Sequence, residues 1–284
     1  MFRFPIGAML ESFNLPTAEA LEKAASLGIE GIQLYASRGE FSAETMTDDK
    51  IRELMDMMNS NGLVFSALCG DLGKGFGHPE LNPELIEKSK RILDLAKKLG
   101  TDVVTTHIGV VPTDPNHPRY AVMQEACYEL ATYADSVGAH FAIETGPETS
   151  ETLKGFLDSL GSTGVSVNLD PANLVMVTGD DPVVAVHNLQ KYIVHTHAKD
   201  GNMLTRGNPE EIYGVTPMPE DMKGISFFEE VPLGTGTVDF PAYLKALEEI
   251  GYRGYLTIER ECGENPARDI AIAADFLRKT IEEN

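Results

Sequence analysis

The sequence of 284 residues has no tryptophan and only three cysteines, Cys69, Cys127 and Cys262. The cysteines are odd in number and far apart, so they form neither a CxxC zinc motif nor a disulfide framework. No apolar run approaches the length of a transmembrane helix. An acidic residue, Glu11, follows the start too early for the apolar core of a signal peptide. These absences predict a cytoplasmic protein that has no membrane partner.

Basic residues are also scarce. The chain has 23 Lys and Arg residues against 44 Asp and Glu residues, which gives a formal net charge of −21. A strongly acidic surface repels phosphate backbones, so this balance argues against a nucleic acid partner. The apolar fraction of 42% is nevertheless sufficient for a substantial core. We therefore expect a globular protein without a nucleic acid partner.

Short β-rich segments alternate with longer amphipathic segments along the whole chain. Eight strand–helix units in strict alternation predict a parallel sheet, and eight units are the number that closes a (β/α)8 TIM barrel. An open doubly wound sheet is the alternative, but residues 9–12 (MLES) are not the glycine-rich phosphate loop of that fold. We expect residues 1–284 to form this barrel as a single domain. The expected strands are 4–10, 31–35, 64–70, 103–109, 140–146, 165–170, 193–199 and 255–261, and the expected helices are 17–27, 48–61, 83–99, 120–137, 150–160, 181–190, 240–250 and 266–281.

One connection is much longer than the others. Residues 201–238, after the seventh expected strand, are rich in glycine, proline, methionine and acidic residues. So long a loop in a compact domain is usually functional or mobile. It follows the C-terminal end of a strand, which is the face where barrels of this kind hold their active sites. We expect the segment to fold over the site as a lid that excludes water.

Polar and apolar side chains alternate in five of the expected strands. A barrel strand turns one face to the helices and the other to the interior, so the polar sets are expected to point inward. Three carboxylates that meet at the mouth of a barrel repel one another, and burying them unpaired is costly. Pairing with lysine or arginine is the alternative, but few basic residues lie at these strand ends. A divalent cation is the favoured partner of the ionisable residues near the strand ends, which are His107, Glu144, Asp170, His197 and Glu259.

Five motifs follow one another in the second half of the chain. They are IETG (143–146), NLDPAN (168–173), VHTHAKD (194–200), PLGTGTVDF (232–240) and TIERE (257–261). In this order they resemble the xylose isomerase-like TIM-barrel superfamily of sugar (phosphate) isomerases and epimerases, which is related to AP endonucleases of the endonuclease IV type. The resemblance covers essentially the whole chain. It implies that Glu144, Asp170, His197 and Glu259 bind a metal ion, and that Glu144 and Glu259 also act as acid and base.

The implied ligands also indicate the kind of metal. One imidazole and three carboxylates favour a single Mn²⁺ or Mg²⁺ ion, with Zn²⁺, Co²⁺ or Fe²⁺ as alternatives. The AP endonucleases bind three zinc ions and carry DxxH after the sixth strand. Here Asn173 stands in place of that histidine, and no histidine follows His197. Together with the net charge, these departures argue against DNA repair.

The resemblance implies a reaction at an α-hydroxy carbonyl group. A divalent ion polarises such a carbonyl, acidifies the adjacent C–H and stabilises the enediolate. We therefore expect a metal-dependent isomerase or epimerase of a sugar, a sugar phosphate or a polyol. Dehydration of a keto-polyol through the same enediolate is the alternative. A metallohydrolase of the AP endonuclease kind and a non-catalytic sugar-binding barrel are less favoured, and a homo-oligomer stays open.

Other polar residues are candidates for substrate contacts. His107 is expected to point inward at the end of the fourth strand, where it could also simply fill the top of the barrel. Lys199 is in phase with His197 and could meet a substrate oxyanion. His195, one layer deeper, is expected to be a hydrogen-bonded core residue. The candidates for substrate binding are His107, Asn173, Lys199 and Arg206, of which the last could equally be a solvated charge in the long loop.

Overall fold

The computed structural model describes residues 2–284, in which eight parallel strands form a closed barrel. Neighbouring barrel strands are neighbours in the chain, and β10 closes the ring against β1, where Ile6 lies beside Leu256 and Ala8 beside Ile258. The (β/α)8 fold expected from the sequence is confirmed. The barrel strands are β1 (Ile6–Met9), β2 (Gly31–Tyr35), β3 (Val64–Cys69), β4 (Val103–Thr106), β5 (His140–Glu144), β6 (Val165–Leu169), β7 (Ile193–Ala198) and β10 (Leu256–Ile258).

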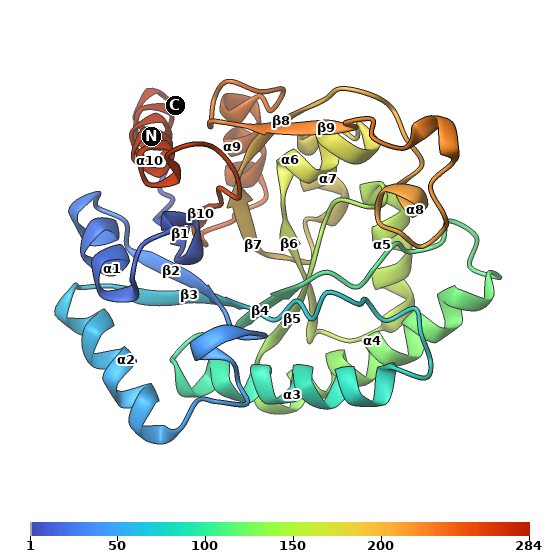
Figure 1. The fold of residues 1–284 in the computed structure, drawn as a ribbon, viewed down its shortest axis with the longest axis horizontal. Coiled ribbons are helices and arrows are strands. Elements are labelled where there is room, and N and C mark those ends of the chain that lie inside the picture. The colour runs from blue at the N-terminus through green and yellow to red at the C-terminus, as the bar shows by residue number, and fades with distance from the viewer. Residues whose placement is uncertain (1) are drawn as a thin grey trace.

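Helices surround the barrel (Figure 1). Their starts follow from local chemistry: the Thr47 and Thr149 side chains each accept a hydrogen bond from a backbone N–H in the first turn of the helix that follows. The helix that ends at Val137 stops because Gly138 takes a left-handed conformation, with φ of 63°. The surrounding helices are α1 (Thr17–Ser26), α2 (Asp48–Ser60), α3 (Asn82–Lys98), α4 (Pro118–Val137), α5 (Ser150–Leu160), α7 (Pro182–Leu189), α9 (Phe240–Glu249) and α10 (Pro266–Glu283).

The main core lies between the strands and the helices. It contains the outward-facing strand residues, such as Phe141 and Ile143 of β5, and the inner faces of the helices, such as Leu153 and Phe156 of α5. The inside of the barrel has a small apolar cluster of Ala67, Val103 and Ala142 and, closer to the mouth, polar side chains. There Gln33 Nε2 donates a hydrogen bond of 2.9 Å to Thr105 Oγ1. This division agrees with the alternation read from the sequence, and it leaves polar side chains to reach the mouth of the barrel.

The long connection after β7 contains regular structure. β8 (Asp200–Met203) pairs in antiparallel fashion with β9 (Phe228–Val231), and a short helix, α8 (Pro209–Ile212), lies between them in the sequence. In Figure 1 this hairpin runs along the upper edge of the molecule, where β8 contacts α6 (Pro171–Asn173) and η3 (Leu174–Thr178). The segment 201–238 thus lies beside the residues that follow β6.

Asp200 holds the two ends of this segment together. Its side chain is buried, and its carboxylate accepts hydrogen bonds of 2.9–3.1 Å from the backbone N–H groups of Gly201, Gly234, Gly236 and Val238. A Cβ atom at residue 236 would lie 2.3 Å from Asp200 Oδ1, so glycine is required there. The PLGTGTVDF motif is therefore a loop that wraps around one carboxylate.

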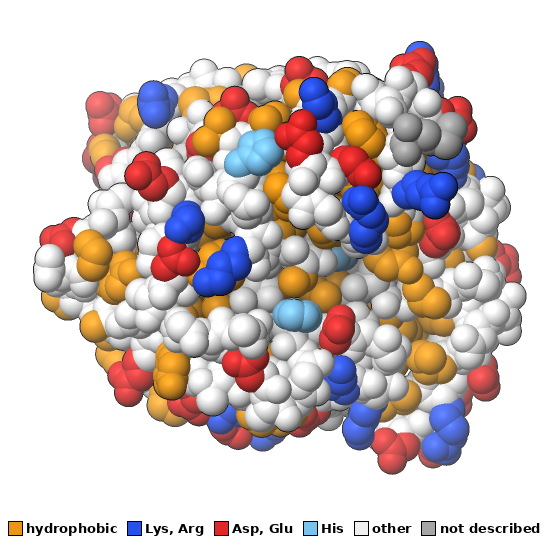
Figure 2. Space-filling view, turned by 180° about the vertical axis from the view of Figure 1, so that it is seen from behind, with side chains coloured by type: hydrophobic (Ala, Val, Ile, Leu, Met, Phe, Trp, Pro, Cys, Tyr) orange, Lys and Arg blue, Asp and Glu red, His pale blue; other side chains and the backbone are white. Residues whose placement is uncertain are grey.

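None of the helices within residues 2–284 is both long and apolar enough to cross a lipid bilayer. On the face of the molecule shown in Figure 2, single lysine and arginine side chains are scattered among acidic, apolar and neutral ones.

Candidate metal centre and active site

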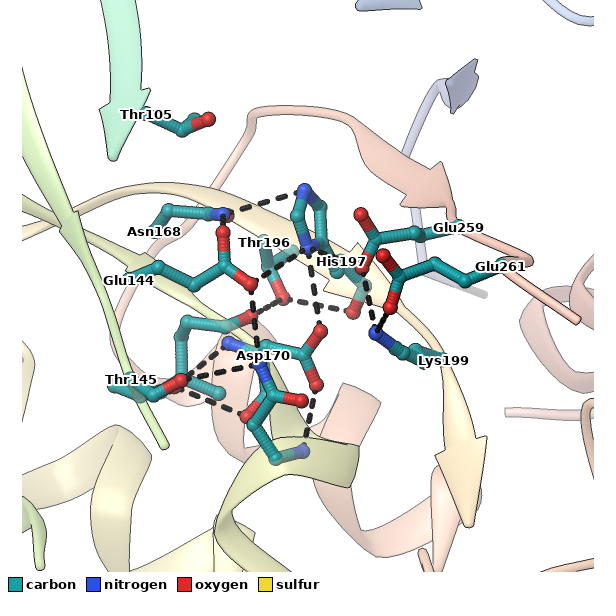
Figure 3. A network of polar contacts seen from close by, with 12 residues as sticks. Thr105, Glu144, Thr145, Asn168, Asp170, Thr196, His197, Lys199, Glu259 and Glu261 are labelled. Carbon is teal, nitrogen blue, oxygen red and sulfur yellow. Dashed lines mark hydrogen bonds and ion pairs between the residues drawn. The ribbon is translucent and has the colours of Figure 1, made fainter. Parts of the chain in front are cut away.

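Four ionisable side chains meet at the C-terminal end of the barrel (Figure 3). Glu144 ends β5, Asp170 directly follows β6, His197 lies near the end of β7, and Glu259 directly follows β10. All four residues are buried, and one candidate ligand atom from each lies within 4.8 Å of those of the others. Because each residue occupies an inward-facing position at the same level of the barrel, strand alternation and register bring them together. The structure therefore assembles the four residues that the resemblance implied.

The imidazole of His197 faces all three carboxylates. Its Nδ1 atom lies 3.2 Å from Asp170 Oδ2, 3.3 Å from Glu259 Oε2 and 3.6 Å from Glu144 Oε1. One N–H group cannot serve three carboxylates well, because it has a single hydrogen. A divalent cation can contact all of them at once and neutralises much of their charge. The donor set of these four residues fits such an ion.

The other nitrogen of His197 has a partner that suits metal binding. Nε2 lies 3.2 Å from Gln33 Oε1, which can accept its proton and so leave the Nδ1 lone pair for a metal. Asn168 Nδ2 lies at the same distance and would donate to Nε2 in the other tautomer. Sequence reasoning missed Gln33. The signal was a single polar side chain in the apolar strand GIQLY, at a position that faces the interior.

Amide side chains orient Glu144. Asn168 Nδ2 donates to Glu144 Oε2 and Asn173 Nδ2 donates to Glu144 Oε1, each over 3.1 Å. Asp170 Oδ1 in turn accepts from the backbone N–H of Asn173 over 2.9 Å, as the N-cap of α6. Asn173 thus contacts both Glu144 and Asp170 in the metal centre.

Opposite charges that lie close together favour the ionised forms of Glu144, Glu259 and Lys199. Burial disfavours the ionised carboxyl of Glu259, but Lys199 and His197 hold its pKa well below the usual value. Burial likewise acts against the ionised form of Glu144, whose pKa is held below the usual value by His107 and His197. Burial also opposes the protonated form of Lys199, yet Glu259 and other carboxylates raise its pKa well above normal. The neighbouring cationic groups therefore favour the ionised forms of Glu144 and Glu259.

A cavity of about 220 Å³ opens beside this cluster. Glu144 and Glu259 both line it, together with three of the four residues expected to bind substrate, His107, Asn173 and Lys199. His107 Nε2 lies 3.5 Å from Glu144 Oε1. Arg206 is exposed and does not line the cavity. Further cavity residues that sequence reasoning did not select are Tyr35, Met176, Tyr213, Phe228, Glu230 and Glu261.

Three of those additional residues show how the long connection takes part in the site. Tyr213, Phe228 and Glu230 all lie within the segment 201–238, far in sequence from the acids of β5 and β6. Glu230 forms an ion pair of 2.5 Å with Arg260, the residue after Glu259. The long connection therefore supplies one wall of the cavity.

The first histidine of VHTHAKD, His195, is buried one layer below the centre. His195 Nε2 lies 2.8 Å from Gln33 Oε1, and burial lowers the pKa of His195 to about 3. The ring is therefore neutral, as expected for a hydrogen-bonded core residue. Gln33 contacts both histidines, which links this layer to the centre above it.

Comparisons with known proteins agree with this geometry. The inosose dehydratase of Clostridium tetani is 30% identical over 154 residues, which cover 51% of this chain. The match covers 46% of that enzyme, so the chain spans less than half the length of this relative. SgbU of Escherichia coli K12, named as a candidate L-ribulose-5-phosphate 3-epimerase, is 23% identical over 95% of this chain and 93% of its own length.

Whole-chain comparisons identify the family. The crystal structure of a xylose isomerase domain protein from Planctomyces limnophilus matches with a TM-score of 0.80 and 26% identity, over 99% of this chain and 98% of that one. Residues 21–280 match the family described as the xylose isomerase-like TIM barrel. With a closed eight-stranded barrel and an acidic centre at its C-terminal mouth, the chain belongs to the xylose isomerase-like TIM-barrel family.

Proposed function

We propose that this protein is a divalent-metal-dependent isomerase or epimerase that acts on the α-hydroxy carbonyl group of a sugar through an enediolate. The observation that carries the proposal is the placement of Glu144 and Glu259. They come from β5 and β10, three steps apart around the ring of eight strands, and both line one cavity. Two carboxylates on different sides of one cavity can exchange a proton with opposite faces of a substrate. In this proposal, residues 1–284 work as one domain.

The residues that would hold the ion are Glu144, Asp170, His197 and Glu259. Their oxygen-rich set favours Mn²⁺ or Mg²⁺, although the imidazole also allows Zn²⁺, Co²⁺ or Fe²⁺. When bound, such an ion supplies Lewis acidity to a carbonyl oxygen and makes the neighbouring C–H more acidic.

The protein's own residues then move the proton. Glu259 is kept ionised by Lys199, so it can accept a proton from the carbon next to the carbonyl. Glu144, oriented by Asn168 and Asn173, would take up a proton from solvent and deliver it on the other side. Return to the opposite face of the same carbon gives epimerisation, and return to the neighbouring carbon gives isomerisation.

The cavity walls suggest how the substrate is held. His107 and Asn173, which both line the cavity, would contact its hydroxyl groups. Lys199 donates to Glu259 over 3.0 Å and to Glu261 over 2.7 Å, which leaves its third N–H for a substrate oxygen. Arg206 would contact the substrate only if the long segment moved inward. Because many of the polar wall residues are acidic, an uncharged sugar or polyol suits the cavity better than a sugar phosphate.

Dehydration of a keto-polyol is the second candidate reaction. The specific observation in its favour is the match to the inosose dehydratase of Clostridium tetani, which is 30% identical over about half of this chain. Dehydration shares the first proton transfer with epimerisation and differs only when a β-hydroxyl leaves. Analysis of the products therefore separates the two reactions.

The proposal is tested by exchange of carbon-bound protons with D₂O. Protein loaded with Mn²⁺ or Mg²⁺ is incubated with ketopentoses, ketohexoses and an inosose, and the products are examined by NMR. We expect one deuterium next to the carbonyl of at least one of these compounds. In the Glu259→Gln variant the metal should remain while exchange falls by ~10²–10⁴, the usual loss for a general base. Exchange at the parent rate in that variant would reduce Glu259 to a ligand and contradict the two-glutamate mechanism.

A further inference from the structure

The long connection places one phenol group in the wall of the catalytic cavity. Tyr213 directly follows α8 and lines the cavity. Within residues 2–284, its hydroxyl group makes no hydrogen bond with protein. Burial and the nearby carboxyl groups of Glu148 and Glu144 raise the pKa of Tyr213 far above its usual value, so the phenol keeps its proton. The hydroxyl group is therefore a donor that is free for a ligand.

This hydroxyl group lies on the same side of the cavity as Glu144. Gly146, two residues after Glu144, is buried, and a Cβ atom there would lie 3.4 Å from Tyr213 Oη and 2.8 Å from Asn173 Cβ. The phenol and Asn173 thus meet over the same glycine. Asn173 Nδ2 in turn donates to Glu144 Oε1 over 3.1 Å. Tyr213 therefore faces the side from which Glu144 would deliver its proton.

Contacts on both sides of Tyr213 hold it in this place. At the start of α8, Asn208 Oδ1 accepts from the backbone N–H of Glu210 over 3.0 Å. The carboxylate of Glu210 forms an ion pair with Arg119, in the first turn of α4. After Tyr213, the backbone N–H of Val215 donates to the carbonyl oxygen of Glu210 over 2.7 Å. The turn that carries the phenol is thus attached to the rim of the barrel through Glu210.

The cavity has many acceptors and few free donors. The side-chain amide of Asn173 already uses its hydrogens on Glu144 and on the carbonyl oxygen of Thr145. A substrate hydroxyl that donates its single hydrogen to a carboxylate still has lone pairs that need a donor. Tyr213 supplies such a donor. The acidic side chains that line the cavity are Asp71, Glu144, Glu230, Glu259 and Glu261.

We infer that Tyr213 is a substrate-contact residue, whose hydroxyl group donates a hydrogen bond to a substrate hydroxyl on the Glu144 side of the cavity, and that the ion pair of Glu210 with Arg119 positions it. The inference rests on the proposed function, because it takes a polyhydroxy carbonyl compound as the substrate. The contact makes the enzyme selective for compounds that carry this hydroxyl group. An analogue without it leaves the phenol unpaired in the complex, which weakens binding.

The test compares substrates that differ by one hydroxyl group. The probes are the ketohexose or inosose that exchanges fastest with D₂O in the metal-loaded parent, and its derivatives in which one hydroxyl group away from the carbonyl is replaced by hydrogen. We expect Tyr213→Phe to lower kcat/KM for the full compound about 3–10-fold, the range of one neutral hydrogen bond. For one deoxy derivative, Tyr213→Phe and the parent should have equal kcat/KM, because that derivative lacks the acceptor of the phenol. Tyr128→Phe, at an exposed tyrosine of α4, is the matched control and should equal the parent on every probe.

The positioning role of Glu210 is tested in the same assay. Glu210→Ala removes the ion pair with Arg119 and keeps the backbone carbonyl that Val215 uses. We expect it to lower kcat/KM severalfold in the parent and to have no effect in the Tyr213→Phe background, because the effect passes through the phenol. A merely structural role would lower kcat/KM by the same factor in both backgrounds. That result, or no loss in either background, overturns the positioning role.

The outcomes separate this inference from the proposed function. If the parent exchanges and Tyr213→Phe has the same kcat/KM on the full compound, the inference fails and the function stands. A loss of the same size on every deoxy derivative also overturns it, because the hydroxyl group then acts within the protein. If no probe exchanges, the proposed function fails, and saturation-transfer NMR with xylitol and myo-inositol decides the inference. Weaker saturation in Tyr213→Phe than in Tyr128→Phe supports it, whereas equal saturation or none overturns it.

Discussion

Lys199 donates a hydrogen bond of 3.0 Å to Glu259, and both side chains are buried at the mouth of the barrel. The two residues come from segments 60 positions apart, which the parallel pairing of β7 with β10 brings together, with His197 beside Thr257. The lysine thus neutralises one acid of a crowded acidic centre. It also keeps that acid ionised, which the proposed proton transfer requires.

Removal of this cation should weaken the fold. Lys199→Met leaves Glu259 and Glu261 without their ammonium partner, and breaking a buried pair commonly costs ~3–5 kcal/mol. We expect a loss of unfolding free energy of that size in urea denaturation of metal-free protein, and slower deuterium exchange in the metal-loaded form. Lys23→Met, in the exposed face of α1, is the control and should change neither quantity. A Lys199→Met variant as stable and active as the parent would show that the pair is dispensable.

The two histidines of VHTHAKD should respond differently to mutation. His197→Ala removes the nitrogen that faces three carboxylates, so bound metal and exchange activity should both fall strongly. Glu144→Gln and Asp170→Asn should also lower metal occupancy. His195→Ala should instead lower stability and leave most of the metal in place, because His195 bonds to Gln33 in the layer below. Elemental analysis of the purified variants measures the occupancy, and full metal in His197→Ala would refute the ligand assignment.

Glu148 should make stability depend on pH. Its side chain is buried, Oε1 has no hydrogen-bond partner within residues 2–284, and burial raises its pKa from 4.5 to about 8. Between these pH values the folded protein binds a proton that the unfolded chain has lost. This group's contribution to stability therefore falls as pH rises, by about 1.4 kcal/mol per pH unit.

The variant Glu148→Gln isolates this effect because its amide does not titrate. We expect the variant to gain stability relative to the parent from pH 5 to pH 8, and the difference to level off above pH 8. Urea denaturation of both proteins across this range is the measurement. Glu151→Gln, at an exposed glutamate, is the control and should show no such trend. A constant difference between Glu148→Gln and the parent would mean that Glu148 is ionised throughout.

Asp200 should control the order of the long segment. Asp200→Ala removes the acceptor of four backbone N–H groups, and each hydrogen bond to a charged group contributes ~1.5–3 kcal/mol. We expect lower stability and faster proteolysis within residues 201–238. Asp221→Ala, an exposed acid in the same segment, should leave cleavage unchanged. If the segment acts as a lid, saturating substrate should slow its cleavage in the parent, whereas equal cleavage with and without substrate would end that interpretation.

Local patterns in the sequence were sufficient to predict most of the fold. Strand 31–35 and helix 150–160 have the same bounds in the structure, because glycine, capping residues and apolar periodicity act over a few neighbouring positions. The strands expected at 103–109 and 255–261 extended too far. The structure ends them at Thr106 and Ile258, where the chain leaves the sheet to form the mouth. Their polar C-terminal residues belong to the site and not to the strand ladder.

The sequence alone determined the alternation of strands and helices, the inward phase of the polar residues and, through the family motifs, the four residues of the centre. Only the tertiary structure decided what surrounds them. Hairpin pairing of β8 with β9 joins segments more than 20 residues apart, so no local pattern reports it. The contact of Gln33 with His195 and His197, and the place of Tyr213 beside Gly146, depend on barrel register and loop packing. Such contacts arise when distant segments are brought together in space, and periodicity along one segment carries no information about its distant neighbours.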